Sequence, residues 1–198
     1  MNKHAARQAR IQLHAPDHDG AVSRILDAYD TGDQADGAWY DDAHQFAQDL
    51  ADEYGTDFRT VAGVLAATSP NTGWLQNKQR TAHLVSCHKG GSPLSGHFKF
   101  VLLKSGLILQ GYEPLDILRG PKERAFFQNI AEPDRPGPVT IDRHALNTSH
   151  PTLNYKQLAR PGVYEQVAAT YRTAARQRDV LPHQVQAVTW CNHRGTAE

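Results

Sequence analysis

Apolar residues recur at helical spacing through most of the chain, whereas sustained alternation of apolar and polar residues, which is typical of strands, is scarce. The clearest stretch is residues 37–55, where Gly55 is suited to end a helix. Its apolar side chains fall on one helical face: Trp39, Ala43, Phe46, Leu50 and Tyr54. The pattern therefore predicts an all-α fold.

Turn and capping residues delimit two more helices after this one. Thr56 or Asp57 can cap a helix that carries an apolar face and closes at Pro70. A third helix is expected to run from Thr72 to the Gly-Gly-Ser-Pro sequence at residues 90–93. These helices and the first supply most of the apolar positions expected in the core.

The second half of the chain is less regular. Gly96, Gly106 and Gly111 are expected to cut the apolar stretch that ends at residue 120 into short helices, or into a helix and a turn. Further helical segments are expected over residues 121–132 with Pro121 in the first position, from Asp142 as a short element, and over residues 161–179 and 182–195.

No internal repeat or interdomain linker divides the chain. Residues 1–20 are polar, with clustered Arg and His, and we expect them to form a loosely attached segment. Residues 21–198 are then expected to form a single helical domain. No apolar run approaches the length of a membrane span or a signal peptide, which predicts a cytoplasmic protein without membrane contact.

Composition narrows the possible ligands. Lys plus Arg and Asp plus Glu number 21 each, so any contact with nucleic acid must be weak and confined to a local basic patch. The two cysteines cannot form a disulfide framework, a zinc site or an iron–sulfur site. A metal held by Asp142, His144, His183 and His193 is a weaker alternative, because Cys191 and His193 diverge on a helix. We therefore predict no metal and no other cofactor.

The stretch "GPVTIDRHALN" at residues 137–147 places Asp142 between a Pro/Gly-rich loop and the first turn of a helix. Aspartate is among the best N-cap residues, so a purely structural role is sufficient to explain it. A carboxylate at a helix N-terminus is also favoured in its charged form and can stabilise a developing cation. Both roles remain open at the level of the sequence.

Two other polar stretches are candidates for ligand contact. "ATSPNTGWLQNK" at residues 67–78 combines an aromatic ring with amides suited to base edges, although Trp74 also opens an apolar helix face and suits the core. "RGPK" at residues 119–122 precedes a helix and suits a phosphate. Lys122 is favoured as a phosphate contact, and a Schiff-base nucleophile is the alternative that the family resemblance given below implies.

Four segments in this order resemble the helix-hairpin-helix DNA glycosylase superfamily: "VAGVLAATSPNTGWLQNKQRTAHLV", "LRGPKERAFFQNI", "VTIDRHALN" and "VQAVTWCNHRG". The chain is also similar to uncharacterised phage and actinobacterial proteins, and to phage thymine-modifying pyrophosphorylases of glycosylase fold. The resemblance implies a glycosylase-like helical domain in which Asp142 assists departure of the base and stabilises the cationic sugar. The family hairpin reads Leu-Pro-Gly-Val-Gly, and this chain has one glycine fewer and a proline there, which weakens the case for duplex binding.

The favoured function is therefore an enzyme that cleaves an N-glycosidic bond in DNA or a nucleotide, with Asp142 and His144 as the catalytic candidates. The alternatives are pyrophosphorylase-like transfer at a hypermodified thymine, and a noncatalytic helical protein that binds a host protein or nucleic acid. The residues expected to contact the substrate are Asn71, Trp74, Asn77, Lys78, Arg119, Gly120, Lys122 and Arg143.

Overall fold

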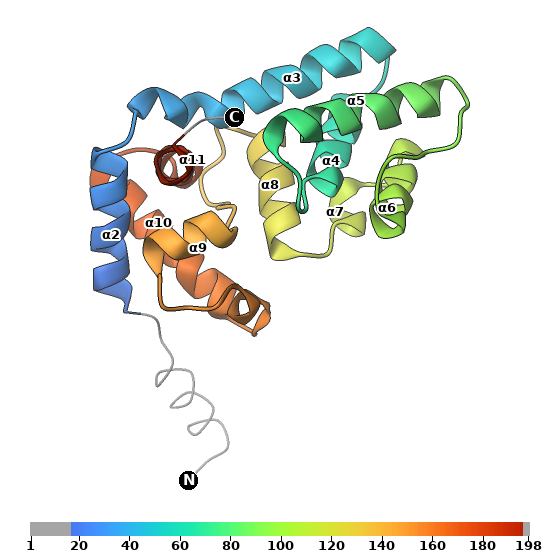
Figure 1. The fold of residues 1–198 in the computed structure, drawn as a ribbon. Coiled ribbons are helices and arrows are strands. Elements are labelled where there is room, and N and C mark those ends of the chain that lie inside the picture. Colours follow the sequence, from blue (N-terminus) through green and yellow to red (C-terminus); the bar gives the residue numbers. More distant parts are fainter. Residues whose placement is uncertain (1–16, 196–198) are drawn as a thin grey trace.

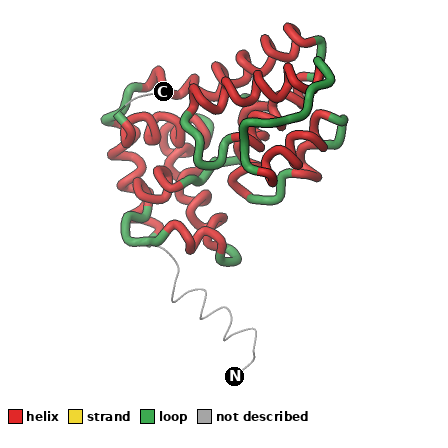
Figure 2. Tube along the Cα trace, turned by 45° about the vertical axis from the view of Figure 1, so that its right-hand side comes forward, coloured by secondary structure: helices red, strands yellow, loops and turns green. Residues whose placement is uncertain are grey.

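The computed structural model describes residues 17–195, and within this range the chain is helical without any strand. This confirms the all-α prediction, and Figure 2 shows helices joined by loops throughout. The elements are α2 (His18–Asp30), the 3₁₀ helix η1 (Gln34–Ala38), α3 (Trp39–Tyr54), α4 (Phe58–Thr68), α5 (Trp74–Lys89), α6 (Lys99–Leu109), α7 (Pro114–Ile117), α8 (Pro121–Ala131), α9 (Arg143–Ser149), the 3₁₀ helix η2 (Tyr155–Ala159), α10 (Val163–Arg178) and α11 (Pro182–Arg194).

The first helix was not foreseen from the sequence. Asp17 accepts a hydrogen bond from the Gly20 backbone N–H at 3.0 Å and caps α2, so the expected boundary at residue 20 falls inside the first turn of this helix. Most of the segment expected to be loosely attached, residues 1–16, lies outside the described residues. Among the described helices, none is long and apolar enough to cross a membrane.

The helices pack around two apolar cores. Helices α3 to α8 surround one core, and α2, α9, α10 and α11 surround the other (Figure 1). Helix α11 touches both, because Ala187 belongs to the first core and Val185 to the second. The boundary between the two cores runs beside α11, and the candidate site lies there.

Local sequence sets the helix ends as predicted. Gly55 adopts a left-handed conformation (φ 55°) after α3, a conformation that residues with a Cβ rarely adopt. Asp57 accepts a hydrogen bond from the Thr60 backbone N–H at 2.8 Å and caps α4. Pro121 and Pro182 each occupy the first position of a helix, where a missing N–H costs nothing.

Gly106 does not interrupt the chain, contrary to the prediction. Helix α6 continues through it to Leu109, and the turn comes only at Gly111 (φ 94°). A helical glycine costs about 1 kcal/mol relative to alanine, and burial of Val101 and Ile108 in the same helix offsets this cost. Packing therefore overrides the local preference here.

A second helical glycine, Gly63, permits close contact between α4 and α7. A Cβ at this position would lie 2.7 Å from Pro114 Cγ and 2.9 Å from Pro114 Cβ. Because the proline ring cannot rotate away, Gly63→Ala is expected to lower the free energy of unfolding by about 1–3 kcal/mol, the usual cost of overpacking. Thermal or urea unfolding of the purified variant measures this.

Gly106→Ala is the matched control, since its Cβ would meet Leu94 Cδ1 at an ordinary 3.4 Å. This variant is expected to gain up to about 1 kcal/mol from helix propensity. An increase in the free energy of unfolding of both variants would contradict the close contact between α4 and α7 at Gly63.

Candidate functional site

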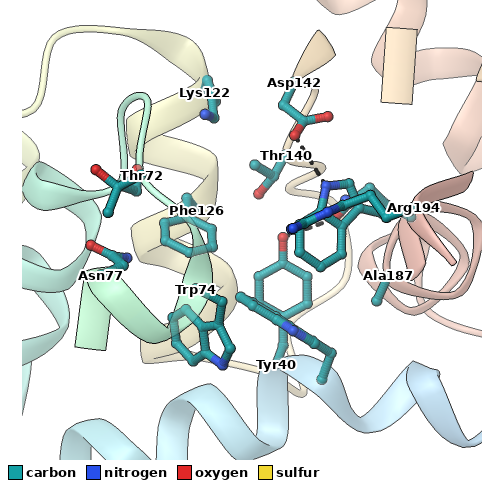
Figure 3. Close-up of a pocket in the computed structure, with 14 residues that line it drawn as sticks. Tyr40, Thr72, Trp74, Asn77, Lys122, Phe126, Thr140, Asp142, Ala187 and Arg194 are labelled. Atoms are coloured by element: carbon teal, nitrogen blue, oxygen red, sulfur yellow. Dashed lines mark hydrogen bonds between the residues drawn. The ribbon is translucent and has the colours of Figure 1, made fainter. Parts of the chain in front are cut away.

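A cavity of about 90 Å³ lies between the two cores (Figure 3). Its space is several times what one water molecule needs, and it opens to solvent. Figure 3 shows Thr72, Asn77, Lys122 and Phe126 on one side, and Asp142, Ala187 and Arg194 on the other. The full lining is Trp39, Tyr40, Ser69, Thr72, Trp74, Asn77, Lys122, Phe126, Thr140, Asp142, Gln186, Ala187, Trp190 and Arg194.

Asp142 is fixed by two hydrogen bonds at the edge of this cavity. Its Oδ1 accepts from the Ala145 backbone N–H at 2.9 Å and caps α9, and its Oδ2 accepts from Trp190 Nε1 at 3.2 Å. The residue therefore is a helix cap and also lines a cavity. A carboxylate has about four acceptor positions, so both oxygens retain capacity to interact with a bound molecule.

Aromatic rings from four helices form the walls. The Trp39 ring lies 4.5 Å from Trp74, 5.9 Å from Phe126 and 5.7 Å from Trp190, measured between ring centroids. These residues come from α3, α5, α8 and α11 respectively. Flat apolar walls of this kind suit a planar ring, which gains from stacking and from the removal of water.

The polar side chains of Tyr40, Thr140 and Gln186, which line the cavity, have fixed hydrogen-bond partners. Tyr40 donates its hydroxyl to Gln186 Oε1 at 2.8 Å, and Asn129 Nδ2 donates to Thr140 Oγ1 at 3.1 Å. Burial raises the pKa of Tyr40 well above its ordinary value, so its hydroxyl stays protonated. These groups are oriented before any ligand enters, which lowers the entropic cost of binding.

Two cations stand at the opening. Lys122 comes from the first turn of α8, and no ion pair links it to another residue between 17 and 195. Arg194, near the end of α11, places its guanidinium 4.6 Å from the Trp190 ring centroid. Both can attract an anion close to the Asp142 carboxylate.

Four of the residues predicted from the sequence meet at the cavity: Trp74, Asn77, Lys122 and Asp142. Trp74 is half-buried, so it serves both the core and the cavity wall, and the two interpretations of this residue are compatible. Asn77 is only 2 % exposed. Its Oδ1 accepts from Thr68 Oγ1 at 2.6 Å and its Nδ2 donates to Leu65 O at 3.1 Å, so much of its hydrogen-bonding capacity is already used.

The other residues that the sequence predicted to contact a substrate do not line the cavity. Lys78 lies beside the wall, with its Nζ 5.3 Å from the Trp74 ring centroid. Asn71 is exposed with a left-handed backbone (φ 57°), and Arg119 and Arg143 are exposed as well. Gly120 is the N-cap of α8.

His144 packs behind Trp190 and not in the cavity. Its ring centroid is 6.4 Å from that of Trp190 and 5.4 Å from that of His193. Its buried Nδ1 has no hydrogen-bond partner among the described residues, and burial lowers its pKa. His144 contacts Trp190, the donor to Asp142, and its own charge interaction with Asp142 favours the protonated imidazole. No cluster of three His, Cys, Asp or Glu residues able to hold a metal occurs within residues 17–195.

Sequence reasoning missed Tyr40, Phe126, Gln186 and Trp190 as residues of the site. The available signal is the spacing of Trp190 and Arg194, four residues apart and therefore on one face of the last helix. Cys191, the next residue, is buried, and burial raises its pKa to about 12, so this thiol stays protonated.

His183 packs against Tyr40 of the cavity lining, and its burial makes the stability of the fold depend on pH. Its ring packs edge-on against Tyr40 at 5.3 Å between centroids, and its side chain is 2 % exposed. Burial lowers its pKa from 6.5 to about 4. Because the unfolded chain binds this proton more readily, stability is fully present above about pH 6.5 and falls as the pH drops toward 4.

When the pH is lowered from 7 to 5, the free energy of unfolding is expected to fall by about 2 kcal/mol because of His183. Urea unfolding of wild type and His183→Gln at both pH values measures the difference. His150, whose pKa is also lowered to about 4 by burial, remains in both proteins and cancels in the comparison. Parallel pH dependences in the two proteins would contradict the assignment.

Comparison with known proteins identifies a family whose function is unknown. Searches of curated proteins and of solved structures each gave no match. Residues 8–197 match the model of a family of unknown function (DUF7178), which spans the cavity and both cores. The chain therefore belongs to the family of unknown function DUF7178.

Proposed function

We propose that this protein is an enzyme that cleaves the N-glycosidic bond between a nucleobase and its sugar. The observation that carries the proposal is the Asp142 carboxylate, held by a backbone N–H and an indole N–H at the edge of a cavity walled by aromatic rings. The resemblance of the surrounding sequence to the aspartate segment of the helix-hairpin-helix glycosylases supports it.

The base is proposed to occupy the aromatic cavity. Trp74 and Phe126 offer ring faces for stacking, and Thr72, Thr140 and Gln186 offer polar atoms for the base edge. Gln186 Oε1 already accepts from Tyr40, so its amide N–H₂ is the group left to donate to a base. A base entering this space must leave its stack, which places its sugar at the opening.

The sugar would then lie beside Asp142. As the bond between C1′ and the base nitrogen breaks, the electron pair leaves with the base and positive charge develops on the sugar. The carboxylate stabilises this charge, and it accepts a proton from the water whose oxygen adds to C1′. Lys122 and Arg194, which line the same cavity, would bind the neighbouring phosphate groups.

Incubation with a panel of oligonucleotides containing damaged and hypermodified bases, read by mass spectrometry, tests this function. The proposal requires release of a free base. A mass change on a base that stays attached to its sugar would indicate the pyrophosphorylase-like transfer instead. Binding without any covalent change across the panel would favour a noncatalytic protein.

Asp142→Asn is expected to lower the rate of base release by about a hundredfold or more, because the charge that faces the sugar is lost. The amide oxygen can still cap α9, but the amide nitrogen would then face the Trp190 N–H and lose that hydrogen bond. The stability cost should therefore be about 1 kcal/mol. Single-turnover rates and urea unfolding measure the two effects, and wild-type turnover in a folded variant would remove Asp142 from the mechanism.

Trp190→Phe keeps an aromatic ring but removes the donor to Asp142 Oδ2. We expect kcat to fall by about tenfold or more with little change in KM, because the carboxylate loses its fixed orientation. Trp74→Phe is the matched control, since Trp74 lines the cavity wall and makes no hydrogen bond to Asp142 among the described residues. This variant should raise KM more than it lowers kcat. Identical kinetic changes in the two variants would contradict a positioning role for Trp190.

A further inference from the structure

Two phenylalanines at the start of α6 are unusually exposed. Phe98 and Phe100 are 57 % and 52 % exposed, and their rings are nearly parallel, with 6° between planes and 5.9 Å between centroids. Leu103, one turn further along α6, is 66 % exposed. Neighbouring apolar side chains on a surface mark an interaction site more often than isolated ones do.

One chain of contacts joins this pair to the cavity through the loop after α4. His97, next to Phe98, lies 3.3 Å from both the Thr68 carbonyl oxygen and Arg80 Nη1, measured from its Nε2. Arg80 Nη1 in turn donates to Thr72 Oγ1 at 2.9 Å. Thr72 lines the cavity, so these contacts link the segment that carries the aromatic pair to the cavity lining.

A second chain of contacts leads from the pair to helix α8, whose Lys122 lies on the same side of the cavity as Thr72. Lys104 Nζ lies 5.8 Å from the Phe100 ring centroid and binds the Glu123 carboxylate at 2.7 Å. Glu123 follows Lys122, the cation at the opening, in the first turn of α8. Figure 1 shows α6 and α8 on either side of α7. These helices surround the first core, and Lys122 of α8 lines the cavity.

Cations lie close to the pair in a chain without net charge. Arg80 contacts His97, and Lys104, which is paired with Glu123, lies near the Phe100 ring. Lys99 is exposed and stands between the two phenylalanines in the sequence. Exposed aromatic faces beside cations match the chemistry of an unpaired polynucleotide, whose bases stack and whose phosphates are negative.

We infer that Phe98 and Phe100 form a stacking platform for unpaired nucleotides that flank the base in the cavity, so that the substrate is single-stranded nucleic acid and not a free nucleotide or a duplex. The inference rests on the proposed function for its link to the cavity. In a duplex the base faces are covered by their neighbours, and an exposed aromatic pair cannot reach them.

Fluorescence anisotropy with a labelled single-stranded DNA, its duplex and a mononucleotide tests the platform on the full chain. Wild type should bind the single strand most tightly. Phe98→Ala/Phe100→Ala should weaken that binding by about tenfold or more, because stacking on aromatic side chains is lost. The salt dependence should stay unchanged, since no cation is removed.

Tyr112→Ala is the control, because Tyr112 is 56 % exposed and follows the C-terminal end of α6, whereas the phenylalanine pair lies at the other end. This variant should bind the single strand as tightly as wild type. Unchanged single-strand binding in the double variant, or equally tight wild-type binding of the duplex, would overturn the platform.

Base release is scored separately on the oligonucleotide panel. If no base is released but single-strand binding still depends on the two phenylalanines, the glycosidic function fails and the platform stands. If base is released and the double variant binds and turns over the strand like wild type, the platform fails and the glycosidic function stands.

Discussion

The hydrogen bond from Trp190 Nε1 to Asp142 Oδ2 is the contact on which the candidate site depends. It joins α11 to the first turn of α9, and its donor ring also packs against Trp39, which belongs to the other half of the molecule. The carboxylate thus cannot move without disturbing the cavity wall. A charge beside aromatic rings is costly unless its hydrogen bonds are satisfied, and the capping N–H and the indole N–H together supply them.

This arrangement explains why one aspartate can have two roles that the sequence presents as alternatives. Capping uses one carboxylate oxygen and fixes the start of α9, while the second oxygen accepts from Trp190. The stabilised helix end and the oriented carboxylate are therefore consequences of the same geometry. Burial lowers the pKa of His144, so this neighbour of Asp142 is neutral near pH 7.

The sequence was sufficient to predict helices wherever the local signal was strong. Gly55, Asp57 and Pro121 set helix ends through backbone geometry that depends on the residue itself. The cavity could be predicted only in part, because its walls come from distant segments: Tyr40 and Gln186 bond across 146 positions. Residues with a polar local context, such as Asn77 and Lys122, were found, whereas Trp190 and Phe126 look like ordinary core positions until the two halves are brought together.

The neutral net charge constrains how such a protein can hold nucleic acid. Each neutralised phosphate contributes affinity through released counterions, so a chain without net positive charge relies for this contribution on the cations near its site. The structure offers aromatic surface as well, in the walls of the cavity and in the ring pair on α6. Stacking requires exposed base faces, so the proposed cavity and platform would favour unpaired bases over the duplex backbone.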